Sequence, residues 1–144
     1  MARNQSFIAA EPERVFAVLA DADRYGDWVV GSKEIRDVEG PFPAPGSRFH
    51  HSVGVGPLVV RDHTEVLEVD APRRLKLEAK ARPLGCATVT LELAPQGGGT
   101  RVTMIEDPSG HTALLRFLPP VHLLARLRNA ESLRRLKALV ERSG

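Results

Sequence analysis

The sequence predicts a single α+β domain that combines an antiparallel β-sheet with a long C-terminal helix. Three observations support this prediction. The chain has 144 residues, the size of one domain with a substantial core. Its middle part alternates apolar and polar residues between Gly- and Pro-containing turns, as antiparallel strands with one buried face do. Its C-terminal part carries apolar residues at helical spacing.

The N-terminal part of the chain predicts one short strand and two helical segments. The strand is expected over residues 3–10. Glu11-Pro12-Glu13 predicts the start of a helix that runs to about residue 20, because proline is favoured in the first turn and acids are favoured near the positive end of the helix dipole. Residues 21–26 predict a further helical turn or two that ends at Gly26 and delivers Tyr25 and Trp28 to its end.

The region after Ser32 predicts six antiparallel strands separated by Gly and Pro turns. The alternation is clearest from Leu75 to Arg82, where leucine and alanine share one face and charged residues share the other. One face of the sheet is therefore expected to be buried and the other solvated. The six strands are expected over residues 32–39, 47–55, 58–70, 73–82, 86–94 and 100–107.

A long helix is predicted at the C-terminus. After an irregular stretch, 108–118, the helix is expected to start at Pro119-Pro120 and to run to about Arg142. Arginine and lysine side chains line both flanks of its apolar stripe, where their stems can lie beside an apolar interface while their charges stay in water. The stripe contains Ala125, Asn129, Leu133, Leu136 and Val140, with Ser132 and Leu139 at its edges.

Composition limits the classes of function. Cys86 is the only cysteine, which excludes an intramolecular disulfide and a multi-cysteine zinc site. No segment approaches the length of a membrane span, and the N-terminus has no long apolar stretch, so a soluble cytoplasmic protein is expected.

Charge is unevenly distributed along the chain, although the formal net charge is only +2. Residues 1–114 hold 13 Lys and Arg against 16 Asp and Glu, whereas residues 115–144 hold 7 against 2. This basic surplus could attract an anionic ligand, a lipid surface or a nucleic acid, but a solvated helix face is the favoured interpretation. No aromatic residue interleaves with the basic run, which argues against nucleic-acid binding.

Five segments carry a resemblance to one known superfamily: IAAEPERVFAVLADADRYGDWV (8–29), EIRDVEG..PAPGSRF (34–49), EVLEVDAPRRLKLEA (65–79), TVTLELAPQGGGTRVTM (88–104) and ESLRRLKALVE (131–141). The chain is similar to the SRPBCC superfamily, which includes START-related lipid-binding domains and the birch-pollen allergen family, and most similar to its bacterial polyketide cyclase/dehydrase-like branch. The resemblance covers nearly the whole chain and implies a helix-grip fold, in which a curved seven-stranded sheet (β-α-α-β6-α) wraps around the long helix in one domain, 1–144. Such a fold specifies activity only weakly.

The resemblance also implies an internal cavity between the sheet and the long helix, which would hold a small hydrophobic or amphipathic ligand such as a lipid or polyketide. Trp28 stands where a tryptophan of this family usually sits near the cavity mouth, although a single tryptophan is more often a core residue. The expected lining is Trp28, Phe49, Val53, Val60, Thr64, Leu77, Val89, Leu91, Met104, Glu106 and Asn129.

The turn at Gly56-Pro57 predicts a register for the strands on either side. Symmetric pairing about this turn places His51 opposite Asp62 on an apolar inner face. The outer face then pairs Arg48 with Glu65, and His50 with His63. A one-residue slip would exchange the two faces, so the complementary pairs on both faces favour this register.

A carboxylate beside an imidazole can act as a general base, because it fixes the imidazole tautomer and raises its basicity. His51 and Asp62 are therefore the candidate catalytic pair. The alternatives are a buried pair that only satisfies its own hydrogen bonds and a pair exposed at the sheet edge through a bulge. Thr64, Glu106 and Asn129 are further inward polar candidates, equally interpretable as groups satisfied by backbone or water.

Other site chemistry finds little support in the sequence. His50 and His51 are consecutive in a strand and point to opposite faces, and His50 with His63 lacks an evident third ligand, so no metal or other cofactor is expected. The glycines at 97–99 join two strands and predict a hairpin turn, not a phosphate loop.

Two functional hypotheses follow, and a third has no distinguishing feature. The favoured one is a carrier or sequestering protein for a small apolar ligand, acting as a monomer or homodimer without nucleic-acid binding or stable membrane insertion. The alternative is a polyketide cyclase/dehydrase-type enzyme in which His51 and Asp62 supply the general base. An interaction partner or regulator on the same scaffold is the third.

Overall fold

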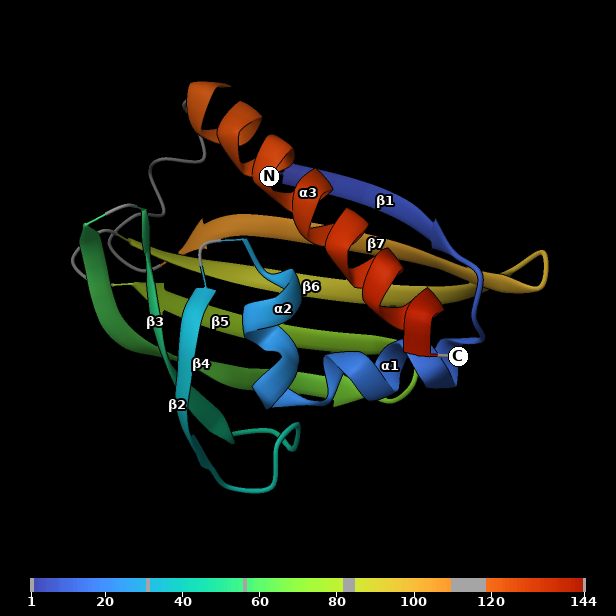
Figure 1. Ribbon diagram of the computed structural model, residues 1–144, viewed down its shortest axis with the longest axis horizontal. Helices are drawn as coiled ribbons and strands as arrows, with labels where there is room; N and C mark the ends of the chain where they lie inside the picture. Colours follow the sequence, from blue (N-terminus) through green and yellow to red (C-terminus); the bar gives the residue numbers. More distant parts are fainter. Residues whose placement is uncertain (1, 31, 56, 82–84, 110–118, 144) are drawn as a thin grey trace.

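The structure is a computed structural model that describes residues 2–30, 32–55, 57–81, 85–109 and 119–143. Its seven strands form one antiparallel sheet in the order β1-β7-β6-β5-β4-β3-β2. Figure 1 shows that the sheet is curved and that the helices lie on its concave side. The strands are β1 (Ala2–Ile8), β2 (Ser32–Glu39), β3 (Arg48–Val55), β4 (Leu58–Asp70), β5 (Arg74–Ala81), β6 (Gly85–Gln96) and β7 (Gly99–Ser109). The helices are α1 (Pro12–Leu19), the 3-10 turn η1 (Ala22–Arg24), α2 (Tyr25–Trp28) and α3 (Pro119–Ser143).

This architecture is the predicted helix-grip α+β fold. The order of elements is the predicted one, and all six strands expected after Ser32 agree within one residue at their N-terminal ends and two at their C-terminal ends. The strand expected over 100–107 extends two residues further, to Ser109, because it stays paired with β6 as far as Cys86. None of the described helices is long and apolar enough to cross a membrane.

The helical segment before β2 differs from the prediction. It was expected to end at Gly26, but α2 continues through this glycine to Trp28. Gly26 does not have the positive φ that makes glycine a helix terminator, and a Cβ here would meet nothing within 4 Å. The segment starts at Asp21, whose carboxylate accepts the Asp23 backbone N–H at 3.1 Å.

The register of β3 and β4 is the one predicted from the turn at Gly56-Pro57. His51 pairs with Asp62 and Phe49 with Thr64. On the outer face the Arg48 guanidinium lies 3.7 Å from a carboxylate oxygen of Glu65, its expected partner.

Helix α3 packs along β1 and across α2 and α1 through its predicted stripe. Leu133, Leu136 and Val140 are fully buried in the main core cluster, and Asn129 and Ser132 are buried in the same stripe. Hydrogen bonds fix the position of the helix, since the Ser132 hydroxyl accepts the Val30 backbone N–H at 3.0 Å and Glu141 accepts that of Ala9 at 2.8 Å.

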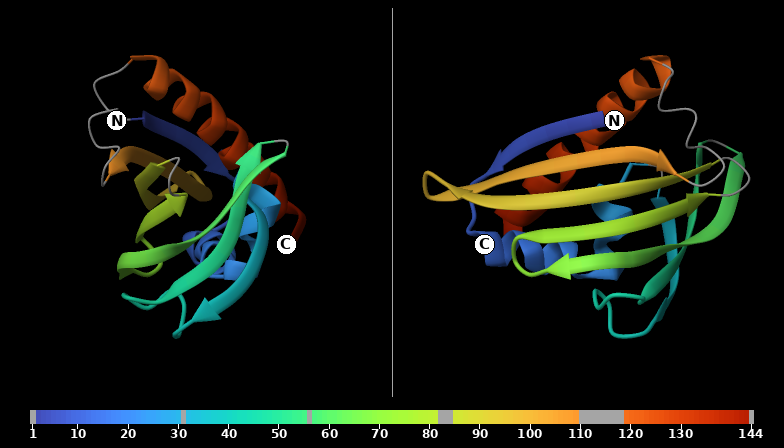
Figure 2. Two further views of the ribbon diagram at one scale, coloured as in Figure 1. Left: turned by 90° about the vertical axis from the view of Figure 1, so that its left-hand side faces the viewer. Right: turned by 180° about the vertical axis from the view of Figure 1, so that it is seen from behind.

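The molecule has two ends that differ in the elements they bring together. At the end of the long axis called here the hairpin end lie the adjoining ends of β3 and β4, the last residues of β7 and the first turns of α3 (Figures 1 and 2). At the opposite end, called here the C-terminal end, the β6–β7 turn lies near α1 and the last turns of α3.

Candidate functional site

Three polar side chains, those of His51, Asp62 and Thr64, lie on the inner face of β3 and β4. They share this face with Phe49, which packs against Tyr25 of α2 with ring centroids 4.7 Å apart. His51 is only 3% exposed, and its Nε2 is hydrogen-bonded to Thr64 Oγ1 at 2.9 Å. The sheet therefore places a buried imidazole and a buried hydroxyl in contact on the concave side.

Asp62 faces His51 across the two strands and is also buried. One of its carboxylate oxygens, Oδ1, accepts the backbone N–H of His63 at 2.9 Å and lies 3.4 Å from His63 Nδ1. The pairing of the two strands is thus confirmed, whereas a hydrogen bond between His51 and Asp62 stays a prediction.

The outer face of the same strands carries a second group of titratable residues. The ring centroids of His50 and His63 are 5.8 Å apart, and His50 Nε2 makes a short contact with the Glu39 carboxylate. Partial burial, followed by the nearby Lys80 ammonium, lowers the pKa of His63. The hydrogen bond from His50 lowers the pKa of Glu39. Within the described ranges no group of three or more metal-ligating side chains is present.

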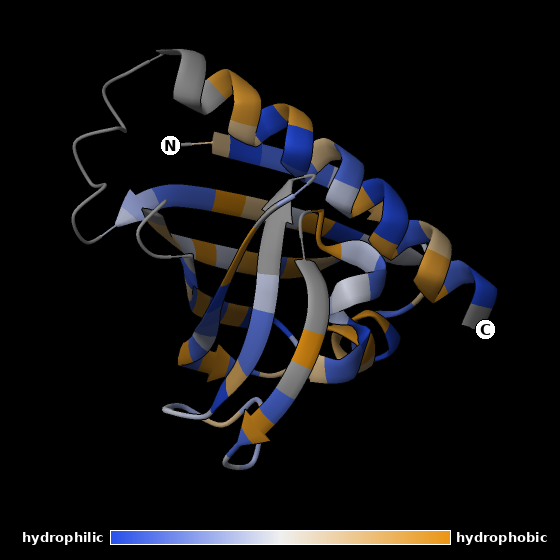
Figure 3. Ribbon diagram, turned by 60° about the vertical axis from the view of Figure 1, so that its left-hand side comes forward, coloured by the Kyte–Doolittle hydropathy of each residue, from blue (hydrophilic) through white to orange (hydrophobic). Residues whose placement is uncertain are grey.

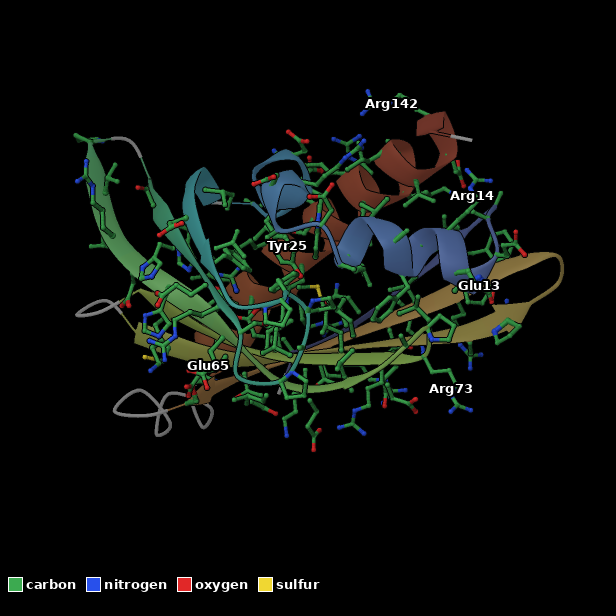
Figure 4. All side chains as sticks on the ribbon, turned by 90° about the horizontal axis from the view of Figure 1, so that it is seen from below. Glu13, Arg14, Tyr25, Glu65, Arg73 and Arg142 are labelled. Atoms are coloured by element: carbon green, nitrogen blue, oxygen red, sulfur yellow. The ribbon has the colours of Figure 1, made fainter. Side chains whose placement is uncertain are left out.

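An aromatic cluster connects α2 to the polar group on β3. The Tyr25 ring lies 5.2 Å from Trp28 and 6.0 Å from Phe42, and the Phe49 ring lies 5.6 Å from His51. Figure 4 shows Tyr25 in the interior between α2 and the sheet, whereas Glu65 and Arg73 lie on the outer side. The Tyr25 hydroxyl donates to the Leu19 carbonyl at 3.0 Å, and burial raises the pKa of this tyrosine.

Trp28 is nearly completely buried in this cluster, as a core tryptophan would be. Its indole Nε1, however, has no hydrogen-bond partner within the part of the chain that the structure describes. An indole N–H usually finds an acceptor when it is buried. Trp28 therefore presents a donor that a bound molecule or a water could satisfy.

A third polar group joins β7 to α3. The Asn129 amide, buried in the helix stripe, donates to Glu106 Oε1 at 2.8 Å. Arg128, from the exposed flank of the same helix, donates through Nη2 to both oxygens of that carboxylate. Two of the predicted inward residues, Glu106 and Asn129, are thus brought together.

The predicted lining residues fall into two classes of burial. Trp28, Phe49, Leu77, Leu91 and Met104 belong to the main core cluster. Val60 and Val89 are only half-buried, as are Ala79 and Ala87, which pair across β5 and β6 beside Thr64. The side chain of Val53 lies outside the described residues. Along β5 and β6 the inner face thus carries large buried residues toward the C-terminal end and smaller, half-buried ones toward the hairpin end, and the change occurs where Leu77 pairs with Val89.

Sequence reasoning did not identify two contributors to this region. Helical periodicity predicts Arg128 on a solvated flank of the helix, because it does not show that a carboxylate of β7 lies within reach. The pair of Ala79 and Ala87 was treated as part of a buried face. Their small size in two neighbouring strands was a usable signal, because alanines opposite each other leave volume that leucines would fill.

The curved antiparallel sheet and the long C-terminal helix on its concave side define a helix-grip protein. Solved structures of the same fold include protein NE0264 from Nitrosomonas europaea, with 20% identity, a TM-score of 0.73 and coverage of 99% of this chain and 94% of the other. Protein SA2116 from Staphylococcus aureus gives a TM-score of 0.75 at 11% identity, with coverage of 99% and 93%. Ara h 8.0201 gives a TM-score of 0.70 at 15% identity, with coverage of 96% and 95%.

The family follows from the sequence itself. The chain belongs to the family described as "Polyketide cyclase / dehydrase and lipid transport", whose model matches residues 2–141. This confirms the predicted superfamily, and the description of the family includes lipid transport. A comparison with curated proteins gives no match.

Proposed function

We propose that this protein binds one small hydrophobic or amphipathic molecule, such as a lipid or polyketide, against the inner face of the sheet at the hairpin end. The observation that carries the proposal is the incomplete burial of inward-facing apolar residues there. Val60, Ala79, Ala87 and Val89 are half-buried, although they share faces with fully buried leucines. Apolar surface of this kind gains free energy when a ligand removes it from water.

The polar groups around this surface favour an amphipathic ligand. Trp28 Nε1 is a buried donor available to an acceptor, and His51 with Thr64 adds a second polar position on the same concave side. A few placed polar groups within an apolar surface typically fix the orientation of a bound molecule. We propose that the protein works as a carrier or sequestering protein in the cytoplasm, a reducing compartment that suits a chain with one cysteine.

Dye binding tests the proposal. A neutral solvatochromic dye such as Nile red should bind with a stoichiometry of about one and a blue-shifted emission. Val89→Trp should weaken this binding by about tenfold or more, because the new ring occupies the half-buried surface. Ala87→Phe provides a second variant in case the first fails to fold.

The matched control is Val59→Trp, since Val59 is exposed on the outer face of β4. This variant should bind the dye as the wild-type protein does. Equal dye affinity in the wild type, Val89→Trp and Ala87→Phe would overturn the proposal, because the dye would then bind elsewhere on the surface.

The geometry of β3 and β4 favours a second candidate function, general-base catalysis on a polyketide-type substrate. The observation that supports this function is the register of β3 and β4, in which His51 pairs with Asp62 on the concave side and is buried. His51→Ala should then lower turnover of such a substrate by ~100-fold or more without abolishing dye binding. His50→Ala, one residue away on the outer face, should leave turnover unchanged. Ligand binding without turnover by the wild type would leave only the carrier function.

A further inference from the structure

We propose that the first turns of α3 form a docking surface for membranes that contain anionic lipids. Three leucines, Leu123, Leu124 and Leu127, point away from the core and are 58%, 68% and 61% exposed. Their positions fall on the side of the helix opposite Asn129 and Leu136, which are buried. They form the most exposed group of large apolar side chains among the described residues.

The leucines project from the molecule and are not part of its sheet surface. Figures 1 and 2 show the first turns of α3 extending past β1 at the hairpin end. Figure 3 shows apolar residues on these outward turns. A flat lipid surface could therefore meet the leucines without a clash with the curved sheet.

The charge around the leucines selects an anionic partner. Residues 119–130 contain two arginines and no acidic residue. The exposed guanidinium of Arg126 has no acidic partner in the part of the chain that the structure describes, whereas Arg128 is paired with Glu106. Further along the exposed side, Glu131 is shared between Arg134 and Arg135, so the positive charge exceeds the negative. Leucines beside basic residues are typical of helices that lie at the interface of anionic membranes.

The same charge disfavours a second copy of this chain as the occupant. A symmetric dimer through the leucines would bring Arg126 of each copy near the other copy, and like charges would repel. Lipid phosphates instead offer charges of opposite sign and acyl chains that accept leucine side chains. Three leucines are too few for permanent anchoring, so the contact is expected to be reversible.

Vesicle co-sedimentation tests this surface with the full chain. The wild type should bind vesicles of phosphatidylcholine with roughly one third phosphatidylglycerol at least about tenfold more strongly than vesicles of phosphatidylcholine alone. Replacement of all three leucines by glutamine should lower binding to the anionic vesicles by at least about tenfold. Arg126→Glu should lower it by about five- to tenfold or more, and a rise in salt concentration should weaken the wild type.

Matched control variants distinguish binding through this surface from nonspecific binding of the protein to vesicles. Val38→Gln, Val59→Gln and Leu67→Gln together remove three exposed apolar side chains of the sheet, and this triple variant should bind vesicles as the wild type does. Arg101→Glu reverses an exposed charge on β7 near the C-terminal end and should also leave binding unchanged. Equal vesicle binding by the leucine variant and the wild type would overturn the proposal.

A second outcome that would overturn the proposal is dimerisation through the same leucines. Sedimentation would then show a dimer for the wild type and a monomer for the leucine variant. The vesicle test is also independent of the ligand proposed above. Vesicle binding requires the outer leucines and dye binding requires the inner face, so Val89→Trp should block the dye and leave vesicle binding unchanged.

Discussion

The two ends of the concave face are built from the same strands but differ in side-chain size and burial. In β6, Leu91 and Leu93 are buried toward the C-terminal end, whereas Ala87 and Val89 are half-buried toward the hairpin end. In β5, Leu75 and Leu77 are likewise followed by the half-buried Ala79. One alternating pattern of apolar and polar residues can therefore provide a stabilising core at one end of a strand and an incompletely buried surface at the other.

The helix shows the same division along its length. In α3, Leu133, Leu136 and Val140 complete the core, whereas the stripe at Ala125 is only half-buried. Polar contacts hold both ends of α3, with Glu106 bound by Asn129 near the hairpin end and Glu141 bound by Ala9 near the C-terminal end. We therefore expect folding free energy to come mainly from the C-terminal end and ligand contacts from the hairpin end.

A charge placed in the buried part of the α3 stripe should destabilise the protein most. Leu136 is completely buried, so Leu136→Asp should lower the free energy of unfolding by at least about 4 kcal/mol, because it buries an unpaired carboxylate and leaves a void. Urea denaturation monitored by circular dichroism measures the loss.

The matched variant is Ala125→Asp, three turns earlier in the same stripe. Because Ala125 is half-buried, the carboxylate introduced at this position can reach water, and the free energy of unfolding should fall by only about 1 kcal/mol. Similar losses for the two variants would contradict the division of the helix into a core part and an open part.

A smaller effect should distinguish two neighbouring inward residues of β6. Leu91→Ala should cost about 3 kcal/mol in unfolding free energy, because Leu91 is fully buried and the resulting cavity cannot be filled by water. Val89→Ala, two residues away on the same face, should cost only about 1 kcal/mol because Val89 is half-buried. Denaturation midpoints at an unchanged m-value give both losses, and an equal loss at Val89 would show that the inner face at the hairpin end is also close-packed.

Much of the fold could be predicted because its signals are local. The alternation of β5 and β6, the stripe of α3 and the register of β3 against β4 each depend on nearby residues, and the structure confirms all three. The predicted end of the helix at Gly26 was wrong. Glycine favours a helix end where the backbone has a positive φ, and Gly26 does not have one.

The candidate site could be predicted only in part, because its contacts join elements that are distant in sequence. The register placed His51 opposite Asp62, but the hydrogen bond of His51 to Thr64 depends on side-chain rotamers that no sequence pattern specifies. The contact of Arg128 with Glu106 joins α3 to β7 and depends on how the helix crosses the sheet. The exposure of Ala87 and Val89 depends on how far side chains from other elements cover them, and the local sequence pattern of β6 does not specify that coverage.

The contacts that hold α3 at the C-terminal end should change stability least. The Ala9 backbone N–H, followed by the Lys137 ammonium, lowers the pKa of Glu141. A carboxyl group whose pKa is lower in the folded protein stabilises that state at pH values above its unfolded pKa, and this contribution disappears as the pH falls through the folded pKa. Glu141→Gln should therefore reduce the melting temperature slightly at pH 7 and not at a pH below the folded pKa.

Two melting series over this pH range, for the wild type and Glu141→Gln, measure the contribution. Lys137→Met serves as the comparison variant. It keeps the bond to Ala9, which is the larger cause of the pKa shift, so its melting temperature should retain most of the pH dependence lost in Glu141→Gln. A constant difference between wild type and Glu141→Gln at all pH values would mean that the glutamate contributes by packing and not by its charge. In that case the two ends of α3 would differ in how well their apolar residues are covered and not in their electrostatics.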